Sequence, residues 1–214
     1  QIHHLEAKLV EIPQVLAVSP QMPGTFDEFI ELVRANPRKF NFGSAGMGSY
    51  PHLDAIILNT KAKLQLVHVP YKNGAAGIIP ALLANEIMVS FINMSSVLEH
   101  LRAGKIKAVA AAGKTRLPQL PDVQAISEAG VEGFEINISF GLYAPKGTPK
   151  PVMEKLTAAL QKSVSDPDVR QRLEAMGISA VSADLARPEA LRAHLKNEID
   201  TLGGLLVKAG VKAN

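Results

Sequence analysis

The chain has 214 residues, of which 47% are hydrophobic and 5% aromatic, and its formal net charge is +3. This length suggests one large or two small domains with a substantial aliphatic core. The positive charges are spread along the chain without a Lys/Arg run, which argues against a nucleic-acid partner. The absence of cysteine excludes disulfides and thiolate metal sites.

The first residues provide little periodicity, and the lack of an initiator methionine suggests a processed or truncated chain. Residues 9–18 are apolar and β-branched but are interrupted by Pro13, which predicts one or two short strands. A helix should follow, with Thr25 as its N-cap and Glu28 closing a capping box. Asn36 and Pro37 should end this helix.

A glycine-rich turn at residues 43–49 lies between a predicted strand and a predicted helix at residues 51–61. Gly46 and Gly48 permit positive φ and leave backbone N–H groups uncovered, while Ser44 and Ser49 add hydroxyls. Pro51 suits the first helical turn, so the positive end of the helix dipole should point back into the glycine-rich turn. These features favour a small anion such as a carboxylate, with tight strand-to-helix packing as the alternative.

Other functions of this turn fit the sequence less well. Gly48 is not followed by the lysine of a Walker loop, and no acidic residue stands where a dinucleotide-binding motif requires one. Ser44, His52 and Asp54 resemble a hydrolase set, but the G-x-S-x-G elbow is missing. The histidines share no metal-ligand spacing, so we expect neither a metal nor a cofactor.

The next segments alternate between strands and helices, which predicts a parallel sheet with helices on both faces. Strands are expected at residues 64–70, 87–92 and 106–112, and helices at 75–84, 97–103 and 126–129, followed by an extended run at 134–142. Asn93 follows one of these strands, at the edge where open α/β sheets bind ligands. Tyr71 and Lys72 follow another strand and could contact ligand or form a solvated turn.

The C-terminal part differs, since helices are expected at residues 149–165, 167–176 and 188–208 with a possible strand only at 179–182. We therefore predict that residues 21–139 form a complete α/β ligand-binding lobe. Residues 1–20 and 140–214 would supply the crossing strands and C-terminal helices of another, truncated lobe. In the alternative, these helices pack as arms on the α/β domain of residues 21–139.

Several ordered motifs together resemble the Bug family, the extracytoplasmic solute receptors of tripartite tricarboxylate transporters. The resemblance covers most of the chain, from about Pro13 to its end. The motifs are Ser44-x-Gly46-x-Gly48-Ser49-x-x-His52, His68-Val-Pro-Tyr-Lys72 with Gly74-Ala75, Pro121-Asp-Val123 with Glu128-Ala-Gly130, Phe140-Gly-Leu142 with Ala144-Pro145, and Gly147-Thr-Pro149.

This resemblance implies a two-lobed, periplasmic binding protein type II-like α/β fold, with a parallel or mixed sheet flanked by helices and an incomplete first lobe. It implies a periplasmic receptor, not an enzyme, that closes on a small organic carboxylate and delivers it to membrane transporter subunits. We expect a monomer. The candidate ligand-binding residues are Ser44, Ala45, Gly46, Gly48, Ser49, His52, Tyr71 and Asn93. The alternative is the effector-binding domain of a LysR-type transcriptional regulator, which shares this fold.

Overall fold

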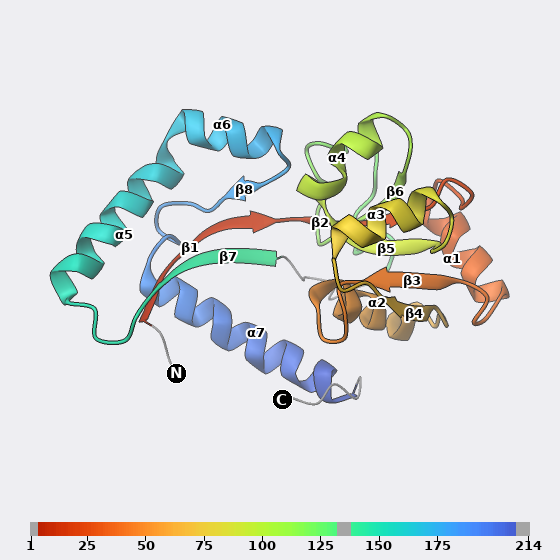
Figure 1. The fold of residues 1–214 in the computed structure, drawn as a ribbon, viewed down its shortest axis with the longest axis horizontal. Coiled ribbons are helices and arrows are strands. Elements are labelled where there is room, and N and C mark those ends of the chain that lie inside the picture. Colours follow the sequence, from red (N-terminus) through yellow and green to blue (C-terminus); the bar gives the residue numbers. More distant parts are fainter. Residues whose placement is uncertain (1–3, 132–137, 209–214) are drawn as a thin grey trace. The chain divides into compact units, whose positions relative to one another are not determined.

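The computed structural model describes residues 4–131 and 138–208, which divide into two compact units (Figure 1). One unit contains the described residues 13–131, and the other contains residues 4–12 and 138–208. Each unit has its own sheet, with five strands in the first and three in the second.

The five-stranded sheet has the strand order β4-β3-β5-β2-β6. Its strands are β2 (Gln14–Val18), β3 (Asn41–Ser44), β4 (Val67–Pro70), β5 (Val89–Asn93) and β6 (Lys107–Ala112). β3 is parallel to β4 and β5, as alternating strands and helices predict, but β2 is antiparallel to both of its neighbours. The sheet is therefore mixed, and the carboxyl ends of β3, β4 and β5 lie at one edge.

Four helices belong to this sheet: α1 (Phe26–Ala35), α2 (Tyr50–Lys61), α3 (Ala75–Leu83) and α4 (Met94–Arg102). α3 and α4 share a buried cluster with β2 and β5 that includes Val15, Ala17 and Leu82. Because side chains alternate along a strand, the buried Leu16 faces the opposite side of the sheet. The helices before and after the glycine-rich turn, α1 and α2, bury Phe29 and Leu58 completely.

Thr25 caps α1 as expected, but the Glu28 carboxylate bonds the Thr25 side chain, whereas a capping box has it bond the Thr25 backbone N–H. The Thr25 hydroxyl accepts the backbone N–H of Glu28 at 3.4 Å and donates to the Glu28 carboxylate at 2.7 Å. The predicted helix at residues 126–129 is wrong, since residues 126–130 form turns. The backbone there is tied to the end of β6, with Ile126 N–H donating to the Ala111 carbonyl at 2.9 Å. The residues that follow form short local turns, with the Ala129 N–H donating to the Ile126 carbonyl at 3.2 Å and the Gly130 N–H to that of Ser127 at 3.2 Å.

The three-stranded sheet has the antiparallel order β7-β1-β8. Its strands are β1 (His4–Ile12), β7 (Ile138–Ala144) and β8 (Ser179–Ala180), and its helices are α5 (Lys150–Ser165), α6 (Pro167–Ala175) and α7 (Pro188–Lys208). α5 and α7 contact β1, while α6 contacts β8. A small core of Ala7, Val164, Val181 and Ala186 joins β1, α5 and the segment between β8 and α7. The extended run predicted from residue 134 is observed from residue 138, and residues 134–137 lie outside the described part.

Two details differ from the expected organisation of the chain. Residues 14–18 belong to the five-stranded sheet, so the division falls at Pro13 and not at residue 21. The C-terminal helices also have a sheet within their own unit, because β1 and β7 pair along most of their length. Of the apolar stripe on α7, Leu191 is buried whereas Ile199 is 71% exposed.

Candidate functional site

The glycine-rich turn lies at the carboxyl edge of the five-stranded sheet, between β3 and α2. Gly46 and Gly48 have φ values of 116° and 79°, a region that favours glycine because it has no Cβ. The Ser44 carbonyl accepts the N–H of Tyr71 at 2.8 Å, which ties the start of the turn to the end of β4. Ser49 occupies the N-cap position of α2, but its side chain makes no capping hydrogen bond.

Both serine hydroxyls of the turn bond within the protein. The Ser44 side chain is fully buried, and its Oγ accepts the N–H of Gly46 at 3.1 Å and lies 2.6 Å from Nε2 of His68. The Ser49 hydroxyl donates to the Gly46 carbonyl at 2.7 Å. Ser44 therefore stabilises the turn through the Gly46 N–H, and Ser49 stabilises it through the Gly46 carbonyl.

Two histidines, His52 and His68, are hydrogen-bonded to the turn. The Gly48 N–H donates to Nδ1 of His52 at 3.1 Å, and the His52 ring packs against that of His68 with their centroids 4.3 Å apart. Phe42 stacks on the other histidine, His68, at 4.8 Å. Burial lowers the pKa of His52, and it also lowers the pKa of His68, with a further contribution from the His52 charge. The predicted site residue His52 thus contacts the backbone of the turn.

Three helices begin at this edge of the sheet, since α2, α3 and α4 follow the neighbouring parallel strands β3, β4 and β5. None of the three has a side-chain cap in the described structure, whereas α1 is capped by Thr25. Uncapped N–H groups and the positive ends of helix dipoles favour a bound anion. The arrangement therefore suits a carboxylate without requiring a Lys or Arg in the turn.

The other predicted site residues lie at the same edge with different degrees of exposure. Ala45 is exposed and Tyr71 is half-buried. Burial raises the pKa of Tyr71, with a smaller contribution from the charge of Glu86. Asn93 stands at the N-cap position of α4 without capping it, and its buried Oδ1 has no hydrogen-bond partner among the described residues. Lys72 is exposed beside Tyr71.

The sequence did not predict a buried polar pair in this region, formed by Gln14 and Asp54. Both side chains are 0% exposed, and Nε2 of Gln14 donates to Oδ2 of Asp54. Burial raises the pKa of Asp54 well above its usual 3.8, although the hydrogen bond from Gln14 partly opposes this. Gln14 is also the direct strand partner of Asn93. The available signal was a single acidic residue within the apolar run of α2.

This geometry offers no hydrolase machinery. Asp54 bonds Gln14, and His52 bonds the backbone of Gly48, so the residues of the hypothetical triad have other partners. Within residues 4–131 and 138–208, no group of three His, Asp or Glu side chains could hold a metal ion. No helix in the same ranges is both long and apolar enough to cross a membrane.

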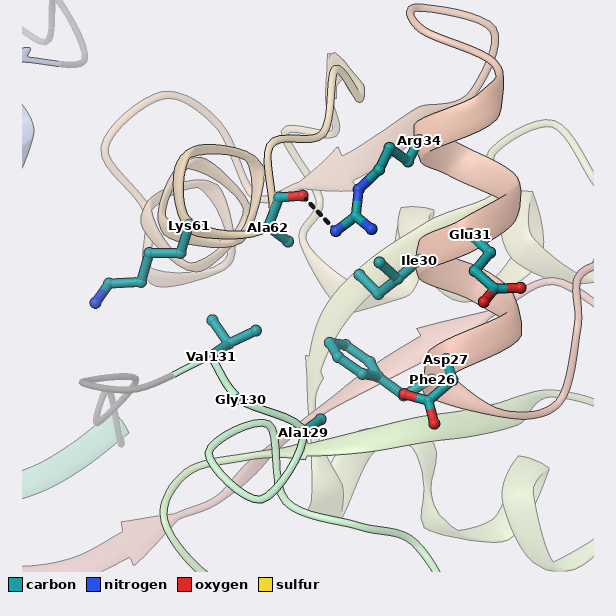
Figure 2. Close-up of a pocket in the computed structure, with 10 residues that line it drawn as sticks. All are labelled: Phe26, Asp27, Ile30, Glu31, Arg34, Lys61, Ala62, Ala129, Gly130 and Val131. Atoms are coloured by element: carbon teal, nitrogen blue, oxygen red, sulfur yellow. Dashed lines mark hydrogen bonds between the residues drawn. The ribbon is translucent and has the colours of Figure 1, made fainter.

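A separate pocket of about 380 Å³ lies between α1, the end of α2 and residues 129–131 (Figure 2). Phe26 and Ile30 form part of its apolar wall, with Asp27 and Glu31 on the same helix. Arg34 donates to the Ala62 carbonyl at 3.0 Å and so caps the end of α2. None of the predicted site residues lines this pocket, which we interpret as a groove between packed elements.

A mixed α/β sheet whose helices begin beside a glycine-rich turn is the architecture of a small-ligand-binding protein. The chain belongs to the tripartite tricarboxylate transporter receptor family, because the model of the "Tripartite tricarboxylate transporter family receptor" matches residues 3–201. This finding confirms the resemblance carried by the sequence motifs. It also sets aside the alternative of a LysR-type effector domain.

Solved structures confirm the predicted α/β fold of periplasmic binding proteins. The periplasmic binding protein BugD is 32% identical with a TM-score of 0.88, over 99% of this chain and 71% of that chain. An R. palustris protein with adipate is 25% identical with a TM-score of 0.89, over 97% and 69%. MatC from Rhodopseudomonas palustris with bound malate is 30% identical with a TM-score of 0.85, over 95% and 69%.

A curated relative, the UPF0065 protein in the tcbD-tcbE intergenic region of Pseudomonas sp. (strain P51), is 34% identical over 207 residues. The alignment covers 95% of this chain, and the chain spans 60% of that relative's length. The family and its structural neighbours are solute-binding receptors and not enzymes, and they indicate an extracytoplasmic location.

Proposed function

We propose that this chain is the ligand-binding part of a periplasmic receptor that captures a small organic carboxylate between two lobes and delivers it to a membrane transporter. The observation that carries the proposal is that three helices without side-chain caps begin at the sheet edge where the glycine-rich turn lies. Similar proteins with bound malate and adipate support a ligand with carboxylate groups. A monomer that presents this site to transporter subunits completes the proposal.

In this proposal, the ligand carboxylate lies above the turn, near Ala45, Gly46, Gly48 and Ser49. Asn93 and Tyr71 flank it from the neighbouring strand ends. Ser44 and His52 act from below, since their side chains are buried and hydrogen-bonded to the turn. Charge-assisted hydrogen bonds of about 1.5–3 kcal/mol each then contribute more than a helix dipole of about 0.3–1 kcal/mol.

The test is isothermal titration calorimetry of the full-length receptor with malate, adipate and citrate. Ser49→Ala should weaken the best of these ligands by roughly tenfold to a hundredfold, because it removes a hydroxyl whose one proton, donated to the Gly46 carbonyl in the ligand-free structure, would turn to the ligand carboxylate. Gly46→Val should weaken binding more, since a β-branched residue resists the positive φ observed there. Lys72→Ala is the matched control and should have a smaller effect.

Two outcomes would contradict this account. If none of the three acids binds, the carboxylate receptor is the wrong function for this site. If Lys72→Ala abolishes binding while Ser49→Ala leaves it unchanged, a direct ion pair holds the ligand and the turn does not.

A further inference from the structure

The two histidines beneath the glycine-rich turn have different hydrogen-bonding roles. Nδ1 of His52 receives a backbone N–H from Gly48, and a backbone N–H can only donate. Nδ1 of His52 must therefore carry no proton, so a neutral His52 has its hydrogen on Nε2. Protonating this ring at Nδ1 would break its bond to the turn.

His68 is under no such restriction. Its Nε2 lies 2.6 Å from the Ser44 hydroxyl oxygen, and that hydroxyl also lies 3.1 Å from the Gly46 carbonyl. When the hydroxyl donates to Gly46, its oxygen can accept both the N–H of Gly46 and an N–H from His68. A hydroxyl has one donor and two acceptor positions, so all three bonds can form together. His68 can thus become an imidazolium without losing a contact to the turn.

Few titratable or charged groups face His68 from the elements packed around it. From α2 it faces His52, whose role requires a neutral ring, while the buried Asp54 on the same helix has a raised pKa. From β3 it faces Phe42 and Ser44, neither of which is charged. Tyr71 and Lys72 follow its own strand, and Glu86, which follows α3, acts on Tyr71.

Without ligand, burial and the neighbouring imidazole both lower the pKa of His68, which favours its uncharged form. The two ring centroids are only 4.3 Å apart, so a single proton is the most that the pair accommodates near neutrality. A carboxylate above the turn would reverse this preference, since an opposite charge nearby favours the protonated imidazole.

We propose that His68 takes up a proton from solvent when a carboxylate binds at the turn, so that the receptor binds the anion together with one proton. The proposal rests on the proposed function of the turn. The imidazolium, held by the Ser44 hydroxyl, would supply next to the turn the positive charge that residues 43–49 lack. His52 stays neutral and holds Gly48, which makes it a positioning residue.

The direction of the pH dependence follows from linkage. Ligand raises the pKa of His68, so between the ligand-free and ligand-bound pKa values the affinity increases as pH falls. The limit is a tenfold gain in affinity per pH unit for one full proton taken up. Below the ligand-free pKa, His68 is already protonated, and it no longer contributes to the pH dependence.

The experiment measures proton uptake by calorimetry of the full-length receptor in buffers of low and high ionisation enthalpy, with malate, adipate and citrate as probes. Near pH 7, we expect the binding enthalpy to change between buffers by the equivalent of a substantial fraction of one proton. His68→Gln retains an amide near the Nε2 position but cannot become charged, so it should remove this uptake. His100→Gln, a half-buried histidine on α4, is the matched control and should retain it.

A second measurement uses the wild-type protein alone, so it does not require any variant to fold. Nitrogen chemical shifts of the wild-type imidazoles should report a neutral His52 with hydrogen on Nε2 in both states, and a His68 pKa that rises with ligand. Binding without proton uptake, or uptake that persists unchanged in His68→Gln, would overturn the role of His68 alone. Failure of all three acids to bind would overturn the proposed function on which it rests.

Discussion

Asp54→Asn should stabilise the protein near neutral pH, although it replaces a buried hydrogen-bonded side chain. The Asp54 carboxyl is completely buried, its pKa is raised by burial, and its Oδ1 has no hydrogen-bond partner among the described residues. The asparagine oxygen can still accept from Nε2 of Gln14. Its amide nitrogen adds donors beside Gln14, whose buried Oε1 also lacks a partner in the described structure.

The magnitude follows from the difference between the folded and unfolded states. The unfolded chain releases the Asp54 proton near its usual pKa of 3.8, whereas the folded chain keeps it to higher pH. Folding stability is therefore greatest below the unfolded pKa and is lost as pH rises toward the folded pKa. The slope is at most about 1.4 kcal/mol per pH unit, or roughly 3 kcal/mol between pH 5 and pH 7 if the folded group stays protonated.

The assay is urea unfolding followed by far-ultraviolet circular dichroism, which suits a chain without tryptophan. The free energy of unfolding of Asp54→Asn minus that of wild type should increase between about pH 5 and pH 7, because the variant has no proton to retain. Asp122→Asn, an exposed acid in the same unit, is the control and should follow the wild-type curve. Parallel curves for Asp54→Asn and wild type would refute the reasoning, as would a variant less stable at neutral pH.

Three further substitutions test interactions within a single unit, and each is measured as a change in the free energy of unfolding in urea. Thr25→Ala removes the cap of α1 and should cost about 1 kcal/mol, while Thr25→Ser should cost much less. Gly43→Ala would place a Cβ 2.5 Å from Cδ1 of the buried Ile87 and should cost about 1–3 kcal/mol, with an unchanged stability contradicting the close packing. Arg170→Met removes bonds to the Val164 and Val181 carbonyls and should cost about 1.5–3 kcal/mol, and an effect no larger than that of the exposed Arg172→Met would contradict this role.

The sequence predicted most elements within a few residues because glycines, prolines and caps mark their ends. Thr25 and Pro51 are examples, and the helices they introduce begin at Phe26 and Tyr50. The reversed direction of β2 could not be predicted, since its pairing partners in β5 and β6 lie roughly seventy to a hundred positions further along the chain. The bond of the Ile126 N–H to the Ala111 carbonyl of β6 could not be predicted for the same reason, and the turns at residues 126–130 follow it in place of the predicted helix.

The candidate site was predictable where it consists of consecutive residues and not where distant segments meet. Glycine spacing identified the turn, and the polar end of β5 identified Asn93. The contact of Gln14 with Asp54 joins residues 40 positions apart, and that of Ser44 with His68 joins residues 24 apart. Such pairs depend on strand order and register, which residue patterns do not specify.

If a carboxylate binds at the turn as proposed, it would meet the starts of α2, α3 and α4, which have no side-chain caps in the described structure. A helix end without a cap frays, and its first amides exchange with solvent through local opening instead of global unfolding. A bound carboxylate would then act as a shared cap for neighbouring helices. Occupancy should therefore slow hydrogen exchange at amides such as those of Ser95 and Ser96, while the first turn of α1, already capped by Thr25, should exchange at the same rate in both states.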